Sequence, residues 1–71
     1  MKEKTVKQRK IRALIELAGG VEIVAAIFGI THSAVFLWYS KGIPAGRAAK
    51  LAELSGGKFT AEEILNEMGA R

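Results

Sequence analysis

Apolar residues recur along this chain at helical spacing in five segments, which are separated by short turns rich in glycine. The first segment, residues 5–18, carries the i, i+3, i+4, i+7 stripe of an amphipathic helix. The stripe consists of Ile11, Leu14, Ile15 and Ala18. Thr5 and Gln8 have the spacing of a capping box, and Gly19-Gly20 ends the predicted helix.

Two shorter helices are predicted next, joined by a tight turn. Residues 21–28 contain a single charged side chain, Glu22, so this helix is apolar on nearly all sides and belongs at the centre of the core. Thr31 is a candidate N-cap for a helix over residues 32–40, and Gly42 ends that helix.

A proline predicts the start of the fourth helix. Pro44 fits the first helical turn, where its missing N–H costs nothing, and the helix is expected to run to Leu54. The residues predicted to face inward are Ala48, Leu51 and Ala52. The turn Ser55-Gly56-Gly57 closes this helix.

The fifth helix is predicted from its N-terminal signals. Thr60 and Glu63 form a capping box, and Phe59 and Ile64 have the spacing of a hydrophobic staple. The helix is expected to end near Met68. All five segments are helical in pattern and none alternates as a strand does, so the fold class is all-α.

Four residues in the second and third helices have a spacing that carries functional meaning. Ala25, Gly29, Val35 and Trp38 stand in the order A-x3-G-x5-V-x2-W, which fits two helices crossing steeply in a helix-turn-helix unit. Ala25 is small where the helices cross, and Gly29 permits a positive φ at the turn. Val35 and Trp38 share the inward face of the second helix of the pair. The alternative is an ordinary corner between two helices.

If this unit binds DNA, the outward face of the third helix reads the bases in the major groove. The candidate base-reading residues are Thr31, His32, Ser33, Phe36, Leu37 and Ser40. Ser33 can hydrogen-bond several bases or a phosphate, and His32 can hydrogen-bond a guanine or a phosphate. A lone histidine lacks companion ligands, so we expect no metal site.

Phe36 and Leu37 are unusual for a reading helix, because Arg, Asn and Gln are the residues that read bases by bidentate hydrogen bonds. One interpretation is apolar contact with thymine methyl groups. A second is that one of the pair is partly core and the other meets a partner subunit; we expect Leu37 to be partly buried and Phe36 exposed. A third is that the helix has become a protein-interaction face.

Three residues are candidates for phosphate contact on either side of the reading helix. Val21 lies at the start of a helix, where free N–H groups bind anions, and Lys41 and Arg47 border the third helix from its C-terminal side. Such contacts position a protein on DNA and carry no sequence code. Surface cations are also often merely solvated.

Charge strengthens the nucleic-acid interpretation. The net charge is +4, and the six basic and two acidic residues within residues 1–20 account for all of it. A basic N-terminal segment, residues 1–12, suits salt-dependent phosphate contact, although it can equally be a solvated helix start.

The remaining composition limits the function classes. Seventy-one residues make one domain, and the absence of cysteine excludes disulfides and thiolate metal sites. No apolar run approaches the roughly 20 residues of a membrane span, so we expect no membrane contact and a cytoplasmic location. No carboxylate pair or nucleophile–base pair is evident, so we expect no enzyme activity, cofactor or small-molecule ligand.

Residues 19 to about 65 resemble the Cro and YdaS-like family of small phage and prophage repressors. The matching positions are Gly19-Gly20, Ala25, Gly29, Val35, Trp38, Gly42-Ile43-Pro44, Arg47, Leu51, Gly56-Gly57, Thr60, Glu62 and Glu63. Three positions depart from that pattern. Val21 replaces a frequent glutamine, and Phe36 and Leu37 replace residues that are usually polar.

The resemblance implies a transcriptional repressor that binds double-stranded operator DNA, often as a dimer on a near-palindromic site. We therefore expect a single five-helix, lambda-repressor-like domain over residues 1–71, acting as a homodimer. The candidate dimer residues are Phe59, Ile64, Leu65 and Met68, whose alternative role is closure of the monomer core. The alternative function is a protein-binding antitoxin or anti-repressor module on the same fold.

Overall fold

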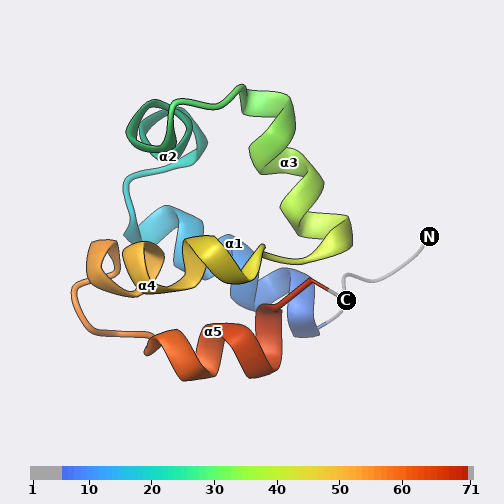
Figure 1. Cartoon of the computed structure of the whole chain (residues 1–71), viewed down its shortest axis with the longest axis vertical. Coiled ribbons are helices and arrows are strands. Elements are labelled where there is room, and N and C mark those ends of the chain that lie inside the picture. Colours follow the sequence, from blue (N-terminus) through green and yellow to red (C-terminus); the bar gives the residue numbers. More distant parts are fainter. Residues whose placement is uncertain (1–5, 71) are drawn as a thin grey trace.

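The computed structural model describes residues 6–70 and consists of five helices joined by short turns (Figure 1). The helices are α1 (Val6–Leu17), α2 (Val21–Phe28), α3 (His32–Lys41), α4 (Ala45–Leu54) and α5 (Ala61–Met68). Between residues 6 and 70 there is no strand beyond one isolated bridge, so the predicted all-α, five-helix fold is confirmed. The predicted capping box of Thr5 and Gln8 includes a residue outside the described range.

Helix α1 holds the molecule together, because it packs against each of the other four helices. Helices α2 and α3 form one side of the domain, and α4 and α5 form the other (Figure 1). All five helices, the α1–α2 turn and the α3–α4 turn supply the buried core. Its members are Ile11, Leu14, Ile15, Ala18, Val24, Ala25, Val35, Trp38, Ile43, Ala48, Leu51, Ile64 and Met68.

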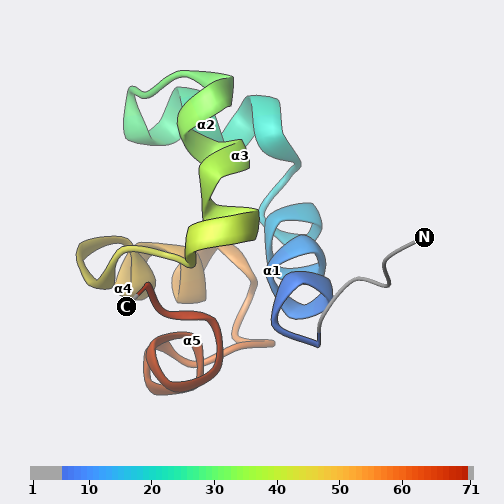
Figure 2. The same ribbon diagram turned by 90° about the vertical axis from the view of Figure 1, so that its right-hand side faces the viewer.

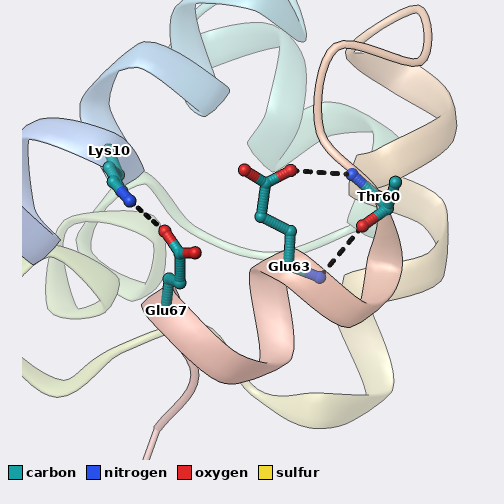
Figure 3. Close-up of polar contacts among 4 residues, drawn as sticks. All are labelled: Lys10, Thr60, Glu63 and Glu67. Carbon is teal, nitrogen blue, oxygen red and sulfur yellow. Dashed lines mark hydrogen bonds and ion pairs between the residues drawn. The ribbon is translucent and has the colours of Figure 1, made fainter.

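The start of α5 has the predicted capping box (Figure 3). The Glu63 N–H donates to the Thr60 hydroxyl oxygen at 3.0 Å, and the Thr60 N–H donates to a Glu63 carboxylate oxygen at 3.4 Å. One turn further along, Glu67 forms an ion pair with Lys10, which ties α5 to α1 (Figure 3). The sequence could predict the local cap but not this contact with a distant helix.

Most of the apolar residues proposed for a dimer surface lie in the monomer core. Ile64 and Met68 are fully buried, and Phe59 packs against the same core. The alternative interpretation, closure of the monomer, is therefore correct for these three residues. Leu65 is the exception, since it remains exposed on α5.

The fourth helix begins one residue later than predicted. Pro44 is the N-cap of α4 with φ −60° and ψ 140°, so it lies just outside the first helical turn. Its carbonyl already accepts a hydrogen bond from the Arg47 N–H at 2.9 Å. An extended ψ is the usual conformation of an N-cap residue. The preceding residue, Ile43, pairs with a distant segment.

That distant segment is the C-terminal end of α5 and the residues after it, which are hydrogen-bonded to Ile43 just beyond the end of α3. The Ile43 N–H donates to the Met68 carbonyl at 2.7 Å, and the Ala70 N–H donates to the Ile43 carbonyl at 2.9 Å. Gly42 makes this approach possible, because it has φ +98° and a Cβ there would lie 2.6 Å from the Gly69 carbonyl oxygen. Glycine at position 42 therefore does more than end a helix.

We expect Gly42→Ala to lower the free energy of unfolding by about 1–3 kcal/mol, since alanine is strained in this backbone region and its methyl group would collide with Gly69. Gly46→Ala is the matched control. Gly46 lies inside α4, and the methyl group of an alanine there would meet no other atom. Alanine at this position should therefore stabilise the protein by about 0.5 kcal/mol. Urea denaturation followed by circular dichroism measures both changes in the free energy of unfolding. Changes of the same sign would contradict the special role of Gly42 in the approach to Gly69.

Candidate nucleic-acid interface

Helices α2 and α3 form the steep corner that the sequence predicted. Their axes differ by 107° across the turn, within the range of a helix-turn-helix unit. Gly29 is left-handed, with φ +67° and ψ 37°. Its N–H donates to the Ala26 carbonyl and the Ile30 N–H donates to the Ala25 carbonyl, which together make a Schellman motif. Local hydrogen bonding therefore fixes the turn.

The three other residues of the A-x3-G-x5-V-x2-W pattern all face the interior, as predicted. Ala25 lies on the inner side of α2, and Val35 and Trp38 are buried on the facing side of α3. The Trp38 ring meets the Phe28 ring edge-to-face, with centroids 5.8 Å apart. Because α3 is held by these contacts along one side, its opposite side is left to solvent.

Phe28 also explains the position of Arg47. The guanidinium carbon lies 4.8 Å from the centre of the Phe28 ring, so α4 is joined to the C-terminal end of α2. The sequence predicted Arg47 beside the C-terminal end of α3, whereas its guanidinium packs against the last residue of α2. The aromatic ring that holds it was missed, because nothing local relates position 28 to position 47.

The N-terminus of α3 is capped as expected. The Thr31 hydroxyl oxygen accepts a hydrogen bond from the Ala34 N–H at 3.2 Å, so Thr31 fixes the helix start. The next two residues, His32 and Ser33, are exposed in the first turn. Ser40, in the last turn, is also exposed, and its hydroxyl donates to the Leu37 carbonyl at 3.2 Å. The polar candidates thus lie at the two ends of α3.

The apolar candidates lie between them, and both are exposed. Phe36 is 57% and Leu37 is 52% accessible to solvent. The expectation that Leu37 would be partly buried is therefore wrong. Consecutive helical residues lie about 100° apart, and Val35 and Trp38 take the inward direction. Positions 36 and 37 consequently fall on either side of the outward direction.

A groove of about 450 Å³ lies beside the outer face of α3. Its lining residues on α1 form the other wall, and the first residue of α2 also lines it. Figure 2 shows that α1 lies next to α3. The lining residues are Arg12, Ile15, Glu16, Val21, Phe36 and Tyr39. The structure therefore brings Val21, a predicted phosphate contact, together with Phe36, a predicted base reader.

Two side-chain pairs define the character of this groove. Arg12 and Glu16 form an ion pair at 3.4 Å on α1, and the rings of Phe36 and Tyr39 lie 6.1 Å apart on α3. Burial raises the pKa of the Tyr39 hydroxyl, Arg12 acts in the opposite direction, and Glu16 adds to the increase. Tyr39 is therefore neutral near pH 7 and can donate a hydrogen bond to an anion.

Cations are spread along the interface and are not gathered in one cluster. Lys41 is exposed at the last position of α3, Arg12 lines the groove, and Arg47 packs on Phe28. Lys10 is paired with Glu67 on α5. Sequence reasoning assigned Arg12 only to a basic N-terminal segment, and it missed Tyr39, whose place beside Arg12 depends on how α1 packs against α3.

Two further properties concern residues 6–70. None of their helices alone is long and apolar enough to cross a membrane; α2 and α3 pass that test only as a pair, bent at the turn. Across the same residues, no three His, Cys, Asp or Glu side chains are grouped as metal ligands would be.

Comparison with protein families gives a match over nearly the whole domain. The model described as bacterial toxin YdaS matches residues 11–68, which run from the first to the last residue of the buried core. The chain belongs to the YdaS family. This family is a prophage-associated group of small helix-turn-helix-like proteins, so the predicted resemblance is confirmed. Neither the curated proteins nor the solved structures contain a significant match.

The contact of Arg47 with Phe28 predicts a measurable contribution to stability. Arg47→Ala should lower the free energy of unfolding by about 1 kcal/mol, because a cation over an aromatic face is lost. Lys50→Ala is the control on the same helix, where only an exposed ion pair with Glu53 is removed, and it should change stability by less than about 0.5 kcal/mol. Equal effects in thermal or urea denaturation would mean that the ring contact contributes nothing.

Proposed function

We propose that this chain is a sequence-specific DNA-binding transcriptional repressor of the phage or prophage Cro type, with α3 in the major groove. The observation that carries the proposal is the α2–α3 unit. Its axes differ by 107°, its inner face is buried, and its outer face is open along the whole of α3. This is the geometry by which such units present a helix to a major groove.

Phosphate contacts are proposed on both sides of α3. The first turn of α2, with its free N–H groups at Val21, lies beside the groove, and Lys41 is exposed at the last position of α3. Arg47 contributes a third contact, since a guanidinium stacked on Phe28 keeps its edge available for hydrogen bonding. Neutral Tyr39 and Arg12 support the Val21 side, where the Glu16 carboxylate limits the attraction.

The proposed partner is a near-palindromic operator bound by a homodimer. A single domain of this size covers little DNA, so two copies on half-sites about one helical turn apart give adequate contact. The role is proposed to be cytoplasmic and non-enzymatic, with no cofactor, membrane or small-molecule partner. The family's prophage association supports a regulatory role in this setting.

A second candidate function is a protein-binding module on the same fold, such as an antitoxin or anti-repressor. One observation favours it. Phe36 and Leu37 expose apolar surface on α3. Binding to DNA separates the two candidates, because a protein-binding module has no need of a salt-sensitive affinity for duplex.

Selection of binding sites from random duplex DNA tests the proposed function. We expect an inverted repeat whose half-sites are spaced by about one helical turn, because each protomer places one α3 in the groove. Recovery of single half-sites would contradict the dimer. Recovery of no enriched sequence, with no retention on DNA at low salt, would contradict the repressor function.

The salt dependence of binding to the selected site tests the phosphate contacts. Lys41→Ala should reduce the slope of log affinity against log salt by about one, because one fewer counterion is released. Lys58→Ala is the matched control, since it removes the same charge from the α4–α5 turn, away from α3 (Figure 1). If both variants lower the slope equally, only net charge matters and Lys41 makes no local contact.

Variants on the outer face of α3 test its orientation. His32→Ala and Phe36→Ala should change which base pairs are preferred at particular positions of the selected site, because these residues are proposed to face base edges. Repeating the selection with each variant measures this change. A uniform loss of affinity for all sequences would instead place both residues against the DNA backbone.

A further inference from the structure

The outer face of α3 has an unusual distribution of hydrogen-bonding groups. His32 and Ser33 occupy the first turn, and no Arg, Lys, Asn or Gln occurs in the helix before its last residue, Lys41. The central turn offers only Phe36 and Leu37 to a ligand. Any base that faces the middle of α3 must therefore be distinguished without hydrogen bonds from that turn.

The two apolar side chains are placed to cover neighbouring positions in a groove. Ser33 and Ser40 lie close to the outward direction of α3, and Phe36 and Leu37 point to either side of that line, since consecutive residues lie about 100° apart. Phe36 is on the side of the α1 groove, where it lines the wall with Arg12. Leu37 is on the other side. Each can approach a different base step.

Phe36 is also held in position. Its ring rests against the half-buried ring of Tyr39, with centroids 6.1 Å apart and planes tilted by 33°. A phenylalanine that is supported by a neighbour loses little conformational freedom when it meets a ligand, and it has only two side-chain torsions. The apolar surface is thus preorganised on one side of α3.

The major groove presents one apolar group to such a surface, the C5 methyl of thymine. We propose that Phe36 and Leu37 read C5 methyl groups, so that thymine is preferred opposite the middle of α3 and 5-methylcytosine is accepted as a second methyl-bearing base. This inference rests on the proposed DNA-binding function. Thymine and 5-methylcytosine share the C5 methyl group. They differ at position 4, where thymine has an oxygen acceptor and 5-methylcytosine has an amino donor. Neither Phe36 nor Leu37 has a group that can detect this difference.

Uracil substitution isolates the methyl group, because uracil pairs as thymine does and lacks only the C5 methyl. In duplexes of the selected site, each thymine is replaced singly by uracil, by cytosine or by 5-methylcytosine, with guanine as the pairing base for the two cytosines. Fluorescence anisotropy at one fixed low salt concentration gives the dissociation constants. We expect about fourfold weaker binding for uracil at one or more thymines of a half-site, which is the effect of burying one methyl group. Where such a thymine is replaced by cytosine, 5-methylcytosine should bind more tightly than unmethylated cytosine by a similar factor.

The same duplexes measured with variants assign the effect to residues. The uracil penalty should disappear at one position with Phe36→Ala and at another with Leu37→Ala. Both residues are exposed, so the variants should retain the helical circular dichroism and the unfolding midpoint of the parent. Leu65→Ala is the matched control, because Leu65 is an exposed leucine on α5, which does not contact α3. Leu65→Ala should lose as much affinity as the parent protein at every uracil substitution.

Distinct outcomes overturn the inference and the function on which it rests. Sequence-specific, salt-dependent binding with no uracil penalty at any thymine would overturn methyl reading and leave the repressor function standing. Penalties that persist in both Phe36→Ala and Leu37→Ala would also overturn it. If Phe36→Ala and Leu37→Ala both bind the site as tightly as the parent, methyl reading by this pair is likewise overturned. Absence of salt-dependent binding to any duplex would remove both proposals.

Discussion

The buried side of α3 is the constraint on which the rest of this structure depends. Trp38 meets Phe28 edge-to-face, and Arg47 lies on the same Phe28 ring, so one aromatic side chain joins α2, α3 and α4. Aromatic pairs of this kind contribute about 0.5–1.5 kcal/mol beyond the area they bury. Once Val35 and Trp38 face inward, the rotation of α3 about its own axis is fixed. That rotation decides which residues meet a partner.

The groove beside α3 combines opposing effects on an anionic partner. The N-terminus of α2, the Arg12 guanidinium and the neutral hydroxyl of Tyr39 favour negative charge, and the Glu16 carboxylate opposes it. Electrostatic attraction at this edge is therefore moderate and local. In the proposed complex with DNA, such an arrangement positions the duplex more than it tightens binding, and selectivity is left to the short side chains and apolar groups of α3.

Local patterns were sufficient to predict the parts of the fold that local hydrogen bonds determine. Gly29 and the Thr60–Glu63 cap follow from chemistry within a few residues, and the structure has both. The contact of Arg47 with Phe28 and the place of Tyr39 beside Arg12 join distant segments, and no periodicity in the sequence relates them. Leu37 was predicted wrongly for a different reason. An apolar residue normally indicates burial, and here the inward direction of α3 is already filled by its neighbours.

The bridge between Ile43 and Gly69 has a consequence for how the domain opens. Because Ile43, in the turn after α3, is hydrogen-bonded to Met68 and Ala70, the chain between these residues forms a closed loop that contains α4 and α5. Fraying of α5 from its C-terminal end must first release the Ile43 amide, which lies in the interior. The Ile43 and Ala70 amides, which both form hydrogen bonds across this junction, should thus lose their protection together in hydrogen exchange. The turn that follows α3 therefore stays in place for as long as the C-terminal end of α5 is folded.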